Sequence, residues 1–188
     1  MSRWIGSIFM LVGLICSWHA ITALDKTTNG SPEQRTAFFK LGLSLLVLSV
    51  PSNFFLGEWR RSVRSSIPGD AREVGNQAGR GLASISLFRG VLLCLSGIGI
   101  WSLAYAARHP GRDADAVWIW ANLAFALLTV LVPLFGFAGF YFGLVGLFQS
   151  RQWRSVAITG LIFNGTVVLP VVLYALTLSG LVNFRIFR

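Results

Sequence analysis

The sequence predicts an all-α fold, a polytopic transmembrane helix bundle with about five membrane spans. Hydrophobic residues make up 54% of the 188 residues, and charged residues only 12%. A soluble domain carries about 25% charged residues, because its surface must be hydrated. Here the few charges lie in the breaks between long apolar runs, so we expect the apolar helices to face lipid and the chain to form a single membrane domain, 1–188.

The first two apolar stretches are each about as long as the 20 residues that a helix needs to cross a bilayer. We interpret 4–24 as a span and not as a cleavable secretory signal, because no small-x-small cleavage site ends it. The second span, 37–57, follows a helix start at Ser31-Pro32-Glu33-Gln34, where Ser31 can cap and Pro32 suits the first turn. Pro51 predicts a kink near its far end.

The last three stretches are 86–107, 116–149 and 155–182. The middle one has no charged residue. As one helix it would be about 51 Å long, whereas the hydrocarbon core is about 30 Å thick. We therefore favour one long helix kinked at Pro133. A break at this proline would instead give two helices and six spans in all.

The longest polar stretch, 58–84, is predicted to be a basic cytoplasmic loop, since Pro68-Gly69 and the glycines after it argue against one continuous helix. Basic loops stay in the cytoplasm, and this loop is the most basic, so the N-terminus is placed there too. The sequence thus predicts a multi-pass protein of the cell (inner, cytoplasmic) membrane.

Three arginines begin this loop, and we predict that they contact anionic lipid headgroups. They are Arg60, Arg61 and Arg64. The alternative is that the loop sets the topology and has no partner of its own. The formal net charge of +9 would suggest nucleic acid in a soluble protein, but basic residues between apolar runs favour the lipid bilayer as partner and no nucleic acid.

A face of small residues is the strongest local signal. Gly136, Gly139, Gly143 and Gly146 recur at spacings of three, four and three, which places them on one side of a helix. A smooth face lets another helix approach closely in lipid. The matching face of the next helix is Ala157, Gly160 and Asn164, and we expect a tight antiparallel hairpin. A glycine-lined pore is the alternative.

Groups that could carry chemistry are few inside the spans: His19, Lys40 and Arg89, with no Asp or Glu. His19 could ligate a haem or pigment metal, with Cys16 one turn away, but a lone His near a helix end is more often hydrogen-bonded or interfacial. Paired carboxylates, a Ser/His/Asp set and a phosphate-binding loop are all missing from the sequence. We therefore predict no catalytic residue, no metal site and no cofactor.

The C-terminal third carries a recognisable pattern: Gly139-x-x-x-Gly143-x-x-Gly146-Leu147, a short basic turn, then Ala157-x-x-Gly160-Leu161. With this pattern, 116–182 resembles a widespread bacterial two-helix membrane domain of unknown function. Asn164 stands where that family more often has glycine. The resemblance implies a two-helix architecture and no activity.

These observations predict a non-enzymatic integral membrane protein, a structural or accessory subunit of a membrane assembly. Its partners in such an assembly would be other membrane subunits or further copies of the chain, and the sequence does not decide between them. The alternative function is a small channel or transport-related protein, or one that binds haem or pigment. The shortage of ionisable groups inside the spans argues against a proton-coupled or cation-coupled transporter.

Overall fold

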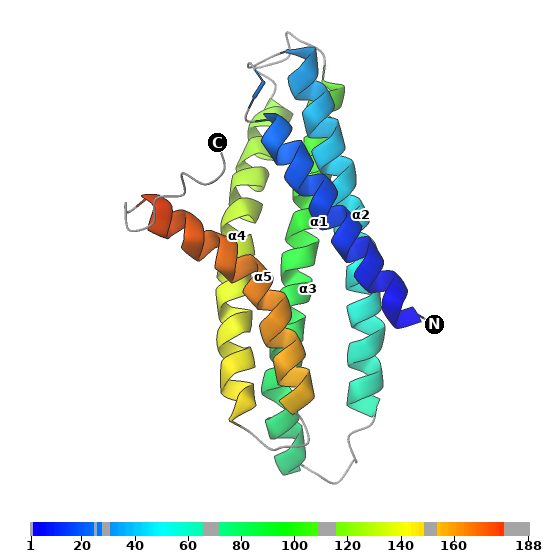
Figure 1. The fold of residues 1–188 in the computed structure, drawn as a ribbon, viewed down its shortest axis with the longest axis vertical. Coiled ribbons are helices and arrows are strands. Elements are labelled where there is room, and N and C mark those ends of the chain that lie inside the picture. Colours follow the sequence, from blue (N-terminus) through cyan, green and yellow to red (C-terminus); the bar gives the residue numbers. More distant parts are fainter. Residues whose placement is uncertain are drawn as a thin grey trace. The chain divides into compact units, whose positions relative to one another are not determined.

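The computed structural model describes residues 2–24, 26–27, 31–65, 72–108, 116–148 and 154–178. They form five α-helices and, within these ranges, no strand (Figure 1). The prediction of an all-α helical fold is therefore confirmed. The helices are α1 (Ser2–Leu24), α2 (Pro32–Ser65), α3 (Arg72–Ala107), α4 (Ala116–Leu147) and α5 (Arg154–Leu178).

Four helices in the described part of the chain are long and apolar enough to cross a membrane. The qualifying segments are Pro32–Ser65, Gly79–Ala107, Val117–Leu147 and Arg154–Thr177. The apolar segment assigned to α1, Leu11–Leu24, is shorter. A fifth span over α1 stays a prediction.

One uninterrupted helix, α4, covers the long uncharged stretch, with Pro133 inside it. The alternative of two separate helices is not what the structure shows. Proline removes one backbone hydrogen bond from a helix, but the bonds on either side can hold the helix together in lipid, where no water competes for them. The 32 residues of α4 give a length of about 48 Å.

The segment predicted as a loop, 58–84, is mostly helical. α2 continues to Ser65, and α3 already begins at Arg72. On the α2 side, Glu58 and Arg61 form an ion pair of 2.9 Å across one turn, and no breaker occurs before Pro68. On the α3 side, Gly81 packs against α5, and this contact offsets the weak helix propensity of glycine.

The chain divides into two compact units that alternate along the sequence. Unit 1 comprises Met1–Arg61 and Arg89–Leu131, and unit 2 comprises Ser62–Phe88 and Val132–Arg188. Both α3 and α4 thus contribute one part to each unit. The prediction of a single membrane domain stays a prediction.

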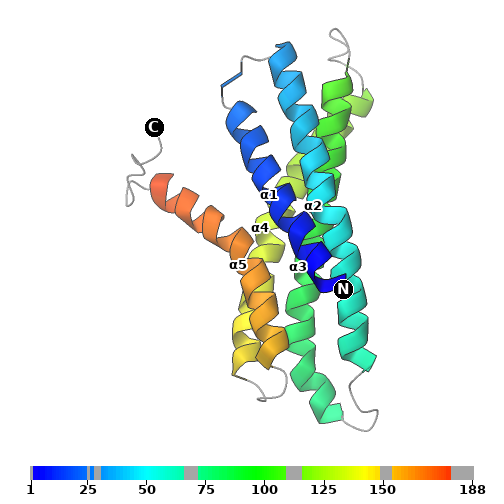
Figure 2. The same cartoon turned by 45° about the vertical axis from the view of Figure 1, so that its right-hand side comes forward.

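In unit 1, α1 packs on α2, and α2 packs on the C-terminal part of α3 (Figure 2). A Cβ on Gly42 of α2 would lie 2.7 Å from the carbonyl oxygen of Gly99 in α3, so the two backbones nearly touch. Gly13 of α1 lies equally close to the backbone of Leu48. Small residues allow this approach, and dispersion forces then hold the helices together.

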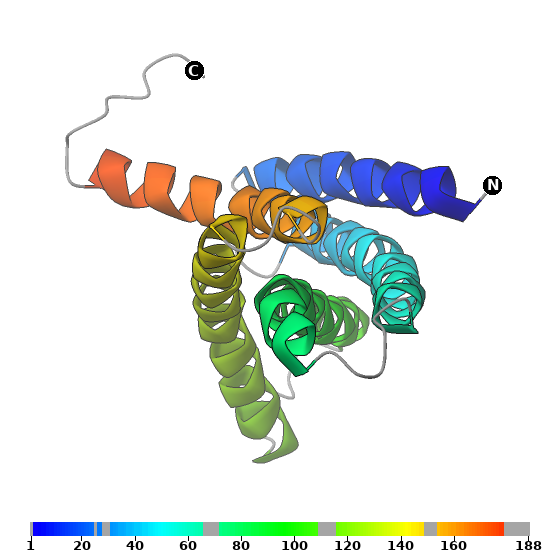
Figure 3. The ribbon, with the colours of Figure 1, turned by 90° about the horizontal axis from the view of Figure 1, so that it is seen from below.

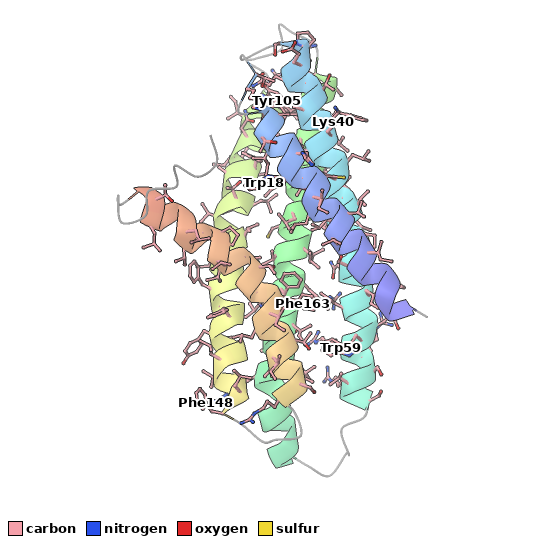
Figure 4. The ribbon with its side chains drawn as sticks, viewed as in Figure 1. Trp18, Lys40, Trp59, Tyr105, Phe148 and Phe163 are labelled. Carbon is pink, nitrogen blue, oxygen red and sulfur yellow. The ribbon has the colours of Figure 1, made fainter. Side chains whose placement is uncertain are left out.

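An aromatic cluster joins α2, α3 and α4 within unit 1. The rings of Trp101 and Phe125 stack with centroids 4.0 Å apart, and the Arg108 guanidinium lies 4.4 Å from the centroid of Trp118. Tyr105, labelled in Figure 4, stacks on Trp101. Aromatic and cationic side chains of this kind are typical of the membrane–water interface.

In unit 2, the C-terminal part of α4 and the first half of α5 form an antiparallel hairpin, and the N-terminal part of α3 packs on α5. Figure 3 shows the end of α4 beside the start of α5, with the second half of α5 leading away from it. Phe88 of α3 stacks on Phe163 of α5 with centroids 5.1 Å apart, and Figure 4 shows Phe163 directed toward α3.

Candidate functional site

The four glycines of α4 are buried, and all four lie against α5. A Cβ on Gly136 would be 2.8 Å from Val167, and one on Gly143 would be 3.1 Å from the backbone of Leu161. Ala157 lies opposite Gly146, where the corresponding distance is 2.9 Å. The structure thus places these glycines in the predicted hairpin contact.

The fourth glycine, Gly139, faces the side chain of Asn164. The amide nitrogen of Asn164 does not bond to α4, however. It donates to the carbonyl oxygen of Ser84 in α3 at 3.0 Å and to that of Gly160 at 2.8 Å, while the Ser84 hydroxyl donates to the carbonyl oxygen of Gly139 at 2.7 Å. Ser84 and Asn164 therefore join three helices, and both are fully buried.

Two features of this junction differ from the sequence prediction. Gly160 was assigned to the α4 face, yet it packs on Ser84 and Ile85 of α3. Ser84 itself was missed, and its only sequence signal is the small-residue spacing Gly81-x-x-Ser84 on a face that also meets α5. The amide nitrogen of Asn164 and the hydroxyl of Ser84 bond between the helices, whereas Oδ1 of Asn164 is buried without a hydrogen-bond partner among the described residues.

His19 lies exposed on α1, as does Cys16 one turn before it. The neighbouring Trp18 is 66% exposed, so this face of α1 is uncovered within the described residues. Those residues contain no group of three or more His, Cys, Asp or Glu side chains placed to hold a metal. His109, the second histidine of the chain, lies outside the described residues.

The three arginines predicted to contact lipid have different surroundings. Arg61 is 78% exposed and pairs with Glu58. Arg64 is exposed. Arg60 is only half-exposed, and its Nε is buried with no hydrogen-bond partner among the described residues.

A fourth arginine, Arg89 of α3, lies against the same helix. Its Nε donates to Oδ1 of Asn53 in α2 at 2.7 Å. Its guanidinium group also covers Gly57, where a Cβ would be 3.3 Å from Nη2. Arg89 lies near the start of the span predicted over 86–107, and neither partner was predicted from the sequence. The signal was present on α2, since Asn53, Gly57 and Arg60 recur at spacings of four and three, which is one helix face.

We call Asn53, Gly57, Arg60 and Arg89 the α2–α3 arginine site. Among the side chains that the structure describes, the acids are Glu33 at the other end of α2 and Glu58, which pairs with Arg61. Neither Arg60 nor Arg89 therefore forms an ion pair with a described acid. A half-buried cation is costly unless an anion or a set of acceptors compensates it.

No family model, curated protein or solved structure matches the chain. The likeness of 116–182 to a bacterial two-helix domain thus stays a prediction from its motif.

Proposed function

We propose that this chain is a non-enzymatic integral membrane protein that serves as an accessory subunit of a membrane assembly. The observation that carries the proposal is the contrast between α4 and the other spans. Within its most apolar window only 11% of the residues are buried, whereas the corresponding share in α2 is 44%. α4 therefore presents most of its surface to whatever surrounds the protein.

Lipid alone would suit the apolar residues of this surface, but Asn122 favours a protein partner. It is exposed in the second turn of α4, among large apolar residues that include Ile119, Leu123 and Leu127. A carboxamide facing lipid loses its hydrogen bonds to water, and polar side chains between membrane helices serve as contacts. We therefore assign α4 to the contact with a second membrane subunit that supplies a polar side chain opposite Asn122.

The distribution of the buried polar groups supports a non-enzymatic role. Ser17 and Ser44 hydrogen-bond at 2.9 Å between α1 and α2, and Ser49 and Ser96 do so at 2.7 Å between α2 and α3. Asn164 forms the three-helix junction of unit 2. These groups hold the chain's own helices together, and catalysis would instead need polar groups that converge on a substrate.

Site-specific photocrosslinking from α4 tests the proposal. A photoreactive residue at Leu123 or Leu127 is introduced in the tagged protein at native expression level, with Val50 of α2, 55% exposed, as the matched lipid-facing control. We expect one discrete protein adduct from both α4 positions and none from Val50. Asn122→Leu should weaken the adduct.

A monomer in mild detergent without any discrete adduct from α4 would refute the subunit role. An adduct with twice the mass of the chain would show self-association and would also count against an accessory role in a larger assembly.

A further inference from the structure

The α2–α3 arginine site has the composition of an anion site. It places the guanidinium group of Arg89 against α2 and, one turn further along the same face of α2, the half-buried side chain of Arg60, and neither pairs with a described acid. A bound anion would compensate the charge of the two guanidinium groups.

The geometry also leaves donors for such an anion. The Nε of Arg89 is used by Asn53, which fixes the plane of the guanidinium group beside Gly57. Its two terminal nitrogens are then held in place, and no hydrogen bond joins them to another described residue. Arg60, one turn beyond Gly57 on the same face of α2, adds a buried Nε with no partner among the described residues.

We infer that the α2–α3 arginine site binds the phosphate group of an anionic phospholipid. A planar guanidinium fork matches the spacing of phosphate oxygens and donates two parallel hydrogen bonds to them. The site also belongs to helices that are apolar enough to span a membrane, so a lipid reaches it without leaving the bilayer. Arg61 lies outside the site, because Glu58 already neutralises it.

This inference goes beyond the proposed subunit role and does not depend on it. The sequence alone predicts that a basic segment is attracted to anionic lipid in general. The structure points instead to two particular arginines, Arg60 and Arg89, which lie 29 positions apart in the sequence. Two sources could supply the same chemistry: the headgroup of a lipid and free inorganic phosphate. The experiment separates them.

The purified full-length protein is placed in nanodiscs of phosphatidylcholine alone or of phosphatidylcholine with phosphatidylglycerol, and its thermal unfolding is followed. We expect phosphatidylglycerol to raise the unfolding temperature of the wild type. The pair Arg60→Gln and Arg89→Gln should lower the affinity for phosphatidylglycerol by at least about tenfold, because charge-assisted hydrogen bonds are lost.

The matched control is the pair Arg61→Gln and Arg64→Gln, which removes the same number of positive charges, both from the end of α2 that carries Arg60. This control should keep nearly all of the wild-type response. An equal loss in both pairs would overturn the inference, since it would show unspecific attraction to a charged surface. Stabilisation by inorganic phosphate in pure phosphatidylcholine, as large as that by phosphatidylglycerol, would also overturn the lipid assignment.

Arg89→Lys keeps the inference testable if the glutamine pair does not fold. Lysine preserves the positive charge but presents no planar fork, so we expect a folded protein with a clearly reduced response to phosphatidylglycerol. If the folded Arg89→Lys protein kept the full wild-type response, the guanidinium group of Arg89 would not be needed to bind the phosphate. The photocrosslinking pattern of α4 should be unchanged in all of these variants, so failure of one proposal is distinguishable from failure of the other.

Discussion

The α4–α5 contact of unit 2 and the α2–α3 contact of unit 1 both join apolar helices at short distance, yet they are built differently. Along α4, four glycines at regular spacing face α5, and no charged side chain takes part. Along α2, one close approach at Gly42 and Gly99 is followed by a serine pair and then by Arg89 with Asn53.

The difference shows two ways in which helices associate in lipid. The α4–α5 contact depends on shape, since its many small residues let dispersion forces act at short range. The α2–α3 contact depends more on polar groups, which are unfavourable in lipid until they meet a partner. A polar contact also fixes the register of the two helices, because the Arg89–Asn53 and Ser49–Ser96 bonds form only when these positions lie opposite one another.

Replacing Gly143 or Gly42 by leucine should produce the two largest effects, and Gly143 tests the α4–α5 contact. Its Cβ would lie 3.1 Å from the backbone of Leu161, which cannot rotate away as a side chain can. We expect a loss of about 1–3 kcal/mol, the usual result of overpacking. Thermal unfolding in mild detergent measures it, with Tyr141→Leu on the exposed side of α4 as control.

Gly42→Leu is the corresponding substitution in α2. It tests whether close packing also stabilises the α2–α3 contact, which contains polar groups. It should destabilise by a similar amount, because its Cβ would lie 2.7 Å from the carbonyl oxygen of Gly99. An unchanged unfolding temperature for Gly143→Leu would refute the shape-based account of the α4–α5 contact.

Asn164→Leu tests the junction of Asn164 with Ser84 in unit 2. The leucine has a similar size but cannot donate to the carbonyl oxygens of Ser84 and Gly160, so these buried acceptors lose a partner. We expect a loss of about 1.5 kcal/mol, near the upper end for hydrogen bonds between membrane helices. Steric trapping or thermal unfolding checks the value. If the variant were as stable as the wild type, the hydrogen bonds of Asn164 would contribute nothing to stability, and packing alone would hold these helices together.

The serine pair of α2 and α3 should contribute least. A double-mutant cycle with Ser49→Ala and Ser96→Ala isolates the hydrogen bond of 2.7 Å between the two hydroxyls. We expect a coupling energy of about 0.6 kcal/mol, the average for such bonds in membranes. A coupling larger than the effect of Asn164→Leu would reverse the ranking of the two contacts.

The glycine face could be predicted because its signal is local. Spacings of three and four place Gly136, Gly139, Gly143 and Gly146 on one side of any helix, and a short turn brings the next helix alongside. The α2–α3 arginine site could not be predicted in the same way. The bond between Arg89 and Asn53 joins positions 36 residues apart, and only packing decides which faces of two helices meet.

By itself the sequence determined that the chain is helical and that most of its helices are apolar enough to cross a membrane, because runs of about 20 apolar residues match the thickness of a bilayer. It did not determine where α2 ends and α3 begins, since an ion pair and a helix contact extend both helices into a segment whose composition favours a loop. Only the tertiary structure paired Asn164 with Ser84, 80 residues apart, and Arg89 with Asn53, 36 residues apart. Such pairings depend on relative helix rotation, a property that no single helix encodes.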